Sequence, residues 1–112
     1  MVVAGQAAHW FDYGKVWPEL SRTVRRGGTL AFWGYKDNVF VEHPAASKVL
    51  DRYCYGEGTM GPYWEQPGRG ILRDLYRVVV PPEGEWEAAG EKWRDVEVEN
   101  EWGSVILLAR RK

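Results

Sequence analysis

Apolar residues fall into a short continuous run and then a helical spacing at the start of the chain. Met1 to Ala4 is a continuous apolar run, which is typical of a buried parallel strand. Apolar residues four positions apart then predict a helix from Tyr13 to Arg26, with Asp12 as its N-cap. Pro18 lies inside this segment and should either bend the helix or move its start later.

The middle of the chain predicts one more strand and two more helices. The β-branched and aromatic residues from Thr29 to Tyr35 predict a second strand. A helix is expected from Pro44 to Tyr55, because Pro suits the first turn and the apolar residues share one stripe. Glycines and prolines mark the stretch from Gly56 to Arg69 as a loop, and a short amphipathic helix is expected from Gly70 to Arg77.

The end of the chain predicts an antiparallel hairpin. Val96 to Glu101 alternates apolar and acidic residues, as an edge strand does. Ser104 to Arg110 is mostly apolar, as an interior strand is. Strands that alternate with helices and end in a hairpin favour an α/β sheet, and 112 residues favour one domain over 1–112.

Composition excludes several classes of partner. With 15 Lys and Arg against 16 Asp and Glu, and no basic stripe, no nucleic-acid partner is expected. The longest apolar runs, such as Val105 to Ala109, are too short to cross a bilayer, and Met1 to Trp10 does not resemble a signal peptide. One cysteine, Cys54, fits a reducing, cytoplasmic compartment. The chain has two histidines, His9 and His43, which are far apart in the sequence. A metal site is therefore not expected.

Aromatic residues are unusually frequent, with seven Trp, six Tyr and three Phe. A core of this size cannot hide all of them, so some should line a cavity, a groove or a subunit interface. The apolar strand Met1 to Ala4 would also expose an edge that invites pairing. Together these two features predict a homodimer.

Four stretches of the sequence resemble the C-terminal half of a class I S-adenosylmethionine (SAM)-dependent methyltransferase. GQAAHWFD (Gly5–Asp12) and RRGGTLAFWGY (Arg25–Tyr35) resemble its strands 4 and 5. GPYWEQPGRGILRDL (Gly61–Leu75) is similar to the trans-aconitate methyltransferase-like branch of methyltransferase type 11. EWGSVILLARR (Glu101–Arg111) resembles the terminal hairpin of that branch.

The resemblance implies half of a Rossmann-like sheet, with strand order 4-5-7-6 and a terminal antiparallel hairpin. In the family, a glycine-rich turn after strand 1 and an acidic residue after strand 2 bind the cofactor. Both would precede Met1, so the expectation is one truncated methyltransferase-like domain that lacks the SAM-binding half. No cofactor is therefore expected for this chain alone. SAM is expected only if a partner supplies the missing half.

Candidate site residues gather where the two parallel strands end, which is where α/β sheets bind ligands. His9 is the catalytic candidate, because it alone there exchanges protons near neutral pH, although a histidine that fixes the loop is the alternative. Arg69 could bind a carboxylate or carbonyl oxygen, or instead pair with Glu65 at the surface. Core packing is the alternative for Trp33, Tyr35, Tyr63 and Trp64. The expected substrate-binding residues are Gln6, Trp10, Trp33, Tyr35, Tyr63, Trp64 and Arg69.

Three classes of function remain open from the sequence. The preferred hypothesis is a methyltransferase-derived protein that has lost SAM binding and become a small biosynthetic enzyme of secondary metabolism. It would isomerise or cyclise an apolar or carbonyl-bearing substrate in an aromatic pocket. The alternatives are a methyltransferase subunit completed by a partner chain, and a non-catalytic binding or scaffold protein.

Overall fold

The computed structural model describes residues 1–88 and 104–112 of the chain. Its sheet has four strands in the order β1-β2-β4-β3, with β1 parallel to β2 and β4 antiparallel to both of its neighbours. This mixed α/β arrangement is compatible with half of a Rossmann-like sheet. The strands are β1 (Val2–Gly5), β2 (Thr29–Tyr35), β3 (Trp86–Ala88) and β4 (Ser104–Arg111).

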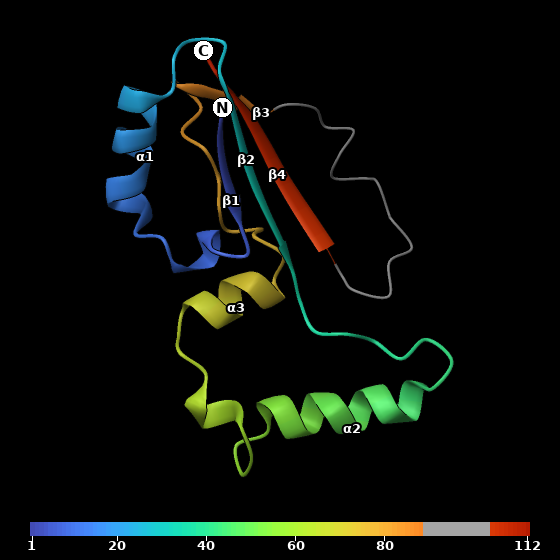
Figure 1. Cartoon of the computed structure of the whole chain (residues 1–112). Helices are drawn as coiled ribbons and strands as arrows, with labels where there is room; N and C mark the ends of the chain where they lie inside the picture. The colour runs from blue at the N-terminus through green and yellow to red at the C-terminus, as the bar shows by residue number, and fades with distance from the viewer. Residues whose placement is uncertain (89–103) are drawn as a thin grey trace.

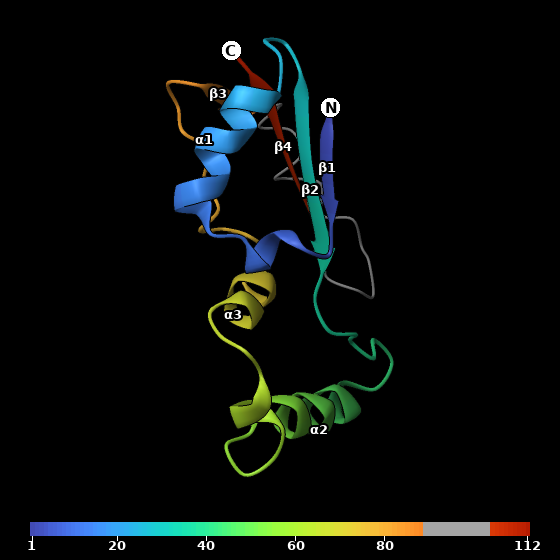
Figure 2. The same cartoon turned by 60° about the vertical axis from the view of Figure 1, so that its left-hand side comes forward.

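The helices divide between the side of the sheet and one of its ends. Helix α1 lies along one face of the sheet, α3 lies at the lower end of that same side, and α2 lies farther out (Figures 1 and 2). No helix in the described part of the chain is long and apolar enough to span a bilayer. The helical segments are η1 (Ala8–Trp10), α1 (Tyr13–Thr23), α2 (Pro44–Tyr55), η2 (Gly61–Tyr63) and α3 (Gly68–Arg73).

The core lies between the sheet and α1. Phe32 of β2 is fully buried, and its ring packs against Phe11 and Trp17 at centroid distances of 5.6 and 6.1 Å. Trp86 of β3 is buried beside them, and its indole nitrogen donates a hydrogen bond to Ser21 of α1 at 3.0 Å. Aromatic packing of this kind adds to the transfer free energy of the buried area. This core fixes the strand ends and therefore the site described below.

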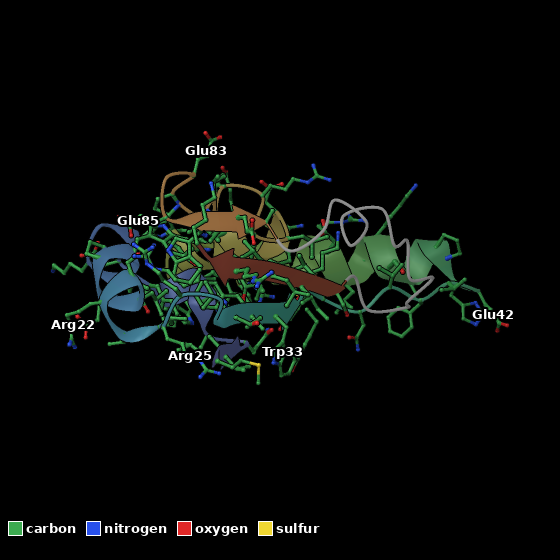
Figure 3. The ribbon with its side chains drawn as sticks, turned by 90° about the horizontal axis from the view of Figure 1, so that it is seen from above. Arg22, Arg25, Trp33, Glu42, Glu83 and Glu85 are labelled. Atoms are coloured by element: carbon green, nitrogen blue, oxygen red, sulfur yellow. The ribbon has the colours of Figure 1, made fainter. Side chains whose placement is uncertain are left out.

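The opposite face of the sheet is apolar and open among the described residues. Val3 of β1, Trp33 of β2 and Ile106 of β4 are all exposed on it, and the Trp33 ring lies over Gly5. These residues share one face because Trp33 pairs with Ile106 and with Gly5, while Val3 pairs with Ala31, two residues before Trp33. Figure 3 shows Trp33 toward the β1 edge of the sheet.

Most predicted elements agree with the structure, and two of them agree residue for residue. Strand Thr29–Tyr35 and helix Pro44–Tyr55 have the predicted bounds. The first strand is displaced by one residue, to Val2–Gly5. Ser104–Arg111 lies between β2 and β3, so its prediction as an interior strand is confirmed.

The prediction for the first helix was wrong at its C-terminal end, and the expectation that Pro18 moves its start later was also wrong. Helix α1 stops at Thr23, because the chain must turn back to the sheet, where the N–H of Gly27 donates to the carbonyl of Arg111 at 2.8 Å. The helix begins at Tyr13 and continues through Pro18, so its start is not delayed. The carbonyl that Pro18 leaves without a donor belongs to Gly14, an exposed residue that water can reach.

The prediction for the third helix was wrong at both ends. Helix α3 spans Gly68–Arg73, where Gly70–Arg77 was predicted. Leu75 and Tyr76 take left-handed backbone conformations, with φ of 51° and 57°, and these end the helix. The turn carries the Tyr76 ring into the core, where it is buried.

The edge partner of β4 also differs from the prediction. Among the described residues, β4 pairs with Trp86–Ala88, a segment that was not predicted as a strand. Trp86 anchors this short strand, because its buried side chain places the backbone beside Arg111. The predicted strand Val96–Glu101 lies outside the described residues.

Candidate ligand-binding site

The C-terminal ends of β1 and β2 are tied together by their own side chains. The Gln6 amide accepts a hydrogen bond from the N–H of Tyr35 at 2.8 Å and donates to the carbonyl of Tyr35 at 3.0 Å. The Tyr76 hydroxyl occupies the space behind Gly34, where an added Cβ would lie 2.6 Å from it. The gap between these strand ends is therefore filled from within the chain.

His9 is held in a buried hydrogen bond. It is 5% exposed, and its Nδ1 lies 3.2 Å from the Tyr76 hydroxyl. Burial lowers the pKa of His9, and the positive charge of Arg69 lowers it further. Burial likewise raises the pKa of Tyr76. Both groups are therefore neutral near pH 7, and the pair ties the segment after β1 to the turn after α3.

Arg69 of α3 connects three other elements. Its guanidinium pairs with the Asp37 carboxylate just after β2 and donates to the Tyr55 hydroxyl at the end of α2. It also lies 4.2 Å from the Trp64 ring, and the Trp64 indole donates to the carbonyl of Cys54 at 2.7 Å. Burial and the hydrogen bond to Asp37 raise the pKa of Tyr55 to about 12. Arg69 thus pairs with Asp37 and not with Glu65.

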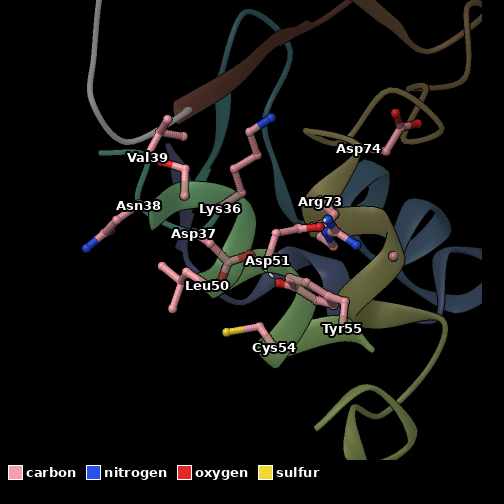
Figure 4. Close-up of a pocket in the computed structure, with 12 residues that line it drawn as sticks. Lys36, Asp37, Asn38, Val39, Leu50, Asp51, Cys54, Tyr55, Arg73 and Asp74 are labelled. Carbon is pink, nitrogen blue, oxygen red and sulfur yellow. Dashed lines mark hydrogen bonds and ion pairs between the residues drawn. The ribbon is translucent and has the colours of Figure 1, made fainter. Parts of the chain in front are cut away.

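A cavity of about 460 Å³ opens beside this network, between the end of β2, helix α2 and helix α3. Arg73 pairs with Asp51 at 2.7 Å, and its guanidinium lies 3.5 Å from the centre of the Tyr55 ring. Figure 4 shows these three side chains together, with Lys36 extending apart from them. The cavity is lined by Lys36, Asp37, Asn38, Val39, Ser47, Leu50, Asp51, Cys54, Tyr55, Gly70, Arg73 and Asp74.

Lys36 differs electrostatically from the other cations beside this cavity. Arg69 and Arg73 are both compensated by carboxylates, whereas Lys36 is half-buried and makes no ion pair within the described residues. An ammonium group in that position attracts an anionic group of a ligand. The apolar and aromatic lining, from Val39, Leu50 and Tyr55, can contact the rest of such a molecule.

The structure brings together some of the sequence-predicted site residues but not all of them. Trp64 and Arg69 are in contact, as are His9 and Trp10, whose ring centroids lie 4.8 Å apart. Trp33 points to the opposite face of the sheet from the neighbouring buried Phe32. The remaining predicted residues divide between the strand ends, where Gln6 bonds Tyr35, and the surface, where Tyr63 is 84% exposed. Their role in binding a substrate stays a prediction.

Sequence reasoning missed the residues that line the cavity. Lys36 and Asp37 stand directly after a strand that was predicted correctly, so their place at its C-terminal end was a usable signal. Asp51, Tyr55 and Arg73 gave no such signal, because they meet only when α2 and α3 come together. No group of three or more His, Cys, Asp or Glu side chains in the described ranges could hold a metal ion.

Comparison with curated proteins relates the chain to methyltransferases. It is 35% identical over 72 residues to the protein of Saccharomyces cerevisiae named "Probable S-adenosylmethionine-dependent methyltransferase CRG1". It is 28% identical over 81 residues to a protein of Dictyostelium discoideum whose name also describes a methyltransferase. The matches cover 64% and 72% of this chain, but only 25% and 30% of those relatives. No family model matches the chain. The chain is therefore methyltransferase-like.

At the described ends of β1 and β2, the groups that could meet SAM, the cofactor in the name of the yeast relative, are engaged within the chain. The Trp33 ring covers Gly5, and both polar atoms of the Gln6 amide are bonded to the backbone of Tyr35. The Tyr76 hydroxyl closes the space behind Gly34. We therefore derive no methyl-transfer step from these residues.

Proposed function

We propose that this methyltransferase-derived chain binds a small carboxylate-bearing molecule in the cavity between β2, α2 and α3. The observation that carries the proposal is Lys36, a cation without an ion-pair partner among the described residues, in a cavity that also has an apolar and aromatic wall. The carboxylate would meet the Lys36 ammonium, and the body of the molecule would pack beside Leu50 and Tyr55.

Binding is favoured over acid–base catalysis by the position of His9. A general base must come within hydrogen-bond reach of the proton that it removes. His9 is 5% exposed and bonded to Tyr76, and it does not line this cavity. Arg69 is likewise engaged by Asp37 and Tyr55. The role proposed for the residues that line the cavity is therefore to hold and orient a bound molecule.

A second candidate is the small cofactor-independent isomerase or cyclase of secondary metabolism. One observation favours it: the lowered pKa of His9 keeps the imidazole neutral near pH 7, as a general base requires. Such an enzyme would need a carbonyl-bearing substrate to reach His9 past Trp10. If this candidate is right, His9→Gln abolishes turnover while Lys36→Met leaves the rate at saturating substrate unchanged.

The binding proposal is tested with two arylalkyl ketones, of which only one carries a carboxylate. Phenylpyruvate carries a ring, a ketone and a carboxylate, whereas benzylacetone carries only the ring and the ketone. NMR titration should show phenylpyruvate shifting the amides of α2 and α3, with weaker binding of benzylacetone. Lys36→Met should raise the Kd for phenylpyruvate by about tenfold, the value of one charge-assisted hydrogen bond.

Lys48→Met is the matched control, because Lys48 is exposed on α2 and does not line the cavity. It should leave the Kd for phenylpyruvate unchanged. Equal binding of the two probes, or equal effects of the two lysine substitutions, would show that Lys36 does not recognise a carboxylate and would end the proposal.

We also propose that this chain by itself binds SAM no more tightly than about millimolar, because a nucleoside without a glycine turn and an acidic ribose partner makes few contacts. The filled gap between β1 and β2 supports the proposal. Titration calorimetry of the 112-residue chain is the measurement. A low-micromolar dissociation constant would contradict it, and would favour a methyltransferase whose cofactor contacts lie in this chain.

A further inference from the structure

The guanidinium of Arg73 on α3 is held in place from two sides. It donates a hydrogen bond to Asp51 of α2 at 2.7 Å, and it lies over the Tyr55 ring at 3.5 Å from the ring centre. The ring is itself supported by Trp64, which stacks beside it at a centroid distance of 6.1 Å. A planar guanidinium that is already stacked and ion-paired loses little freedom when it binds a further group. Arg73 is therefore oriented before a ligand arrives.

Most of the hydrogen-bonding capacity of Arg73 is unused within the described part of the chain. A guanidinium carries five N–H donors, and the hydrogen bond to Asp51 uses one of them. The Arg73 side chain is 41% exposed and lines the cavity of about 460 Å³, so its remaining donors can meet a molecule that occupies the cavity. Gly70 stands one turn earlier on α3 and also lines the cavity. Because Gly70 has no side chain, space stays open beside Arg73.

Lys36 and Arg73 are suited to different groups of a ligand. The Lys36 ammonium makes no ion pair within the described residues, so it attracts a full negative charge. The charge of Arg73 is compensated by Asp51, so a second carboxylate would gain less there. The remaining N–H groups of Arg73 can still donate to a neutral acceptor such as a carbonyl oxygen. The two cations together suit a molecule with one carboxylate and one uncharged oxygen acceptor.

We propose that Arg73 is the second recognition residue of this cavity and that the ligand is an oxo acid, a molecule with a carboxylate and a ketone. This inference rests on the carboxylate site at Lys36 proposed above. The carboxylate meets Lys36, and the ketone oxygen accepts a hydrogen bond from the Arg73 guanidinium. Asp51 acts through Arg73, as a positioning residue that holds the guanidinium over the Tyr55 ring.

NMR titration of the full chain with matched pairs of acids tests the proposal. Phenylpyruvate and 3-phenylpropionate differ only in the oxo group at C2. In the same way, 3-benzoylpropionate and 4-phenylbutanoate differ only in the oxo group at C4. In at least one pair the oxo acid should bind about tenfold more tightly than the plain acid, which is the effect of one hydrogen bond to a charged group. Equal dissociation constants within both pairs overturn the proposal.

A double variant removes the Arg73 pair without changing the net charge. Arg73→Met combined with Asp51→Asn should reduce the preference for the oxo acid to less than about twofold, because the donor is gone. It should leave the Kd of the plain acid within about threefold of the original. Arg22→Met combined with Glu19→Gln is the control, because it removes an exposed pair on α1 whose arginine does not line this cavity. A preference that survives the loss of Arg73 overturns the proposal.

Arg73→Lys decides the question if the double variant releases α2 and binds neither acid. This substitution keeps the charge beside Asp51 but removes the planar group that stacks on Tyr55. The variant should bind the plain acid as before and lose most of the preference for the oxo acid. A full preference in this variant overturns the proposal.

Benzylacetone separates this inference from the carboxylate site on which it rests. If benzylacetone binds as tightly as phenylpyruvate, the carboxylate site at Lys36 fails, and the role of Arg73 fails with it. If the two acids of each pair bind equally, and both more tightly than benzylacetone, the carboxylate site stands and only the role of Arg73 fails.

Discussion

The sheet and the α2 lobe (residues 36–66) are held in place by different forces. The sheet side buries Leu30, Phe32 and Trp86 against α1. No residue of the α2 lobe is buried, and the lobe is attached through the Arg69–Asp37 and Arg73–Asp51 pairs and the ring of Trp64 (Figure 1). One region therefore depends on apolar area and the other on charges, and they should respond to different perturbations.

The largest expected effect is the loss of a core ring. Phe32→Ala removes a fully buried side chain and should lower the free energy of unfolding by about 3–5 kcal/mol. Val49→Ala on α2, where the valine is 60% exposed, should change it by less than about 0.5 kcal/mol. Urea unfolding followed by circular dichroism compares them. Similar losses for both variants would contradict the division into two regions.

Removal of the Arg69 guanidinium should release the lobe without unfolding the sheet. Arg69→Met leaves Asp37 without its cation and should destabilise the docked lobe by about 1–3 kcal/mol. Hydrogen exchange should quicken at the amides of 44–55 and stay slow in β2. Arg77→Met is the control, because the Arg77 pair with Asp74 is exposed and 4.0 Å long. If β2 exchanged faster as well, the lobe and the sheet would be one cooperative unit.

High pH should affect the lobe first. The pKa of Tyr55 is raised from 10.0 to about 12, so its neutral form is favoured in the folded chain. The stability that this preference adds to the folded chain is fully present below pH 10. It is lost as the pH rises to about 12. Trp64 stacks on Tyr55, so its fluorescence should report the loss. Tyr55→Phe should remove the transition, and a transition that persists in this variant would assign it to another group.

Low pH should instead weaken the sheet side, with the smallest effect of the four. Burial and Arg69 lower the pKa of His9 below 6.5, so the folded chain favours the neutral imidazole. The stability that this preference adds to the folded chain is fully present above pH 6.5. It is lost as the pH falls through the lowered pKa of His9. Unfolding free energies between pH 7 and 5 should fall, and His9→Gln should flatten that slope. An unchanged slope in the variant would exclude His9 as its source.

The local pattern of the sequence determined the elements that are specified by their own residue types and by the spacing of their apolar residues. Thr29–Tyr35 and Pro44–Tyr55 were predicted to the residue, because a β-branched aromatic run and a proline-started amphipathic stripe specify their own conformation. The C-terminal ends of α1 and α3 were not, because tertiary contacts end both helices. The pairing of Gly27 with Arg111 limits α1, and the left-handed turn that buries Tyr76 limits α3.

The candidate site was decided almost entirely by the tertiary structure. From the sequence, Arg69 had two candidate partners, a ligand and Glu65, whereas the fold places Asp37 and Tyr55 against it from 32 and 14 positions away. His9 was correctly placed after the first strand, but its burial against Tyr76, 67 positions away, could not be predicted. Spacing along a chain reports neighbours within one element, whereas a site is formed by elements whose distance in sequence carries no information about their distance in space.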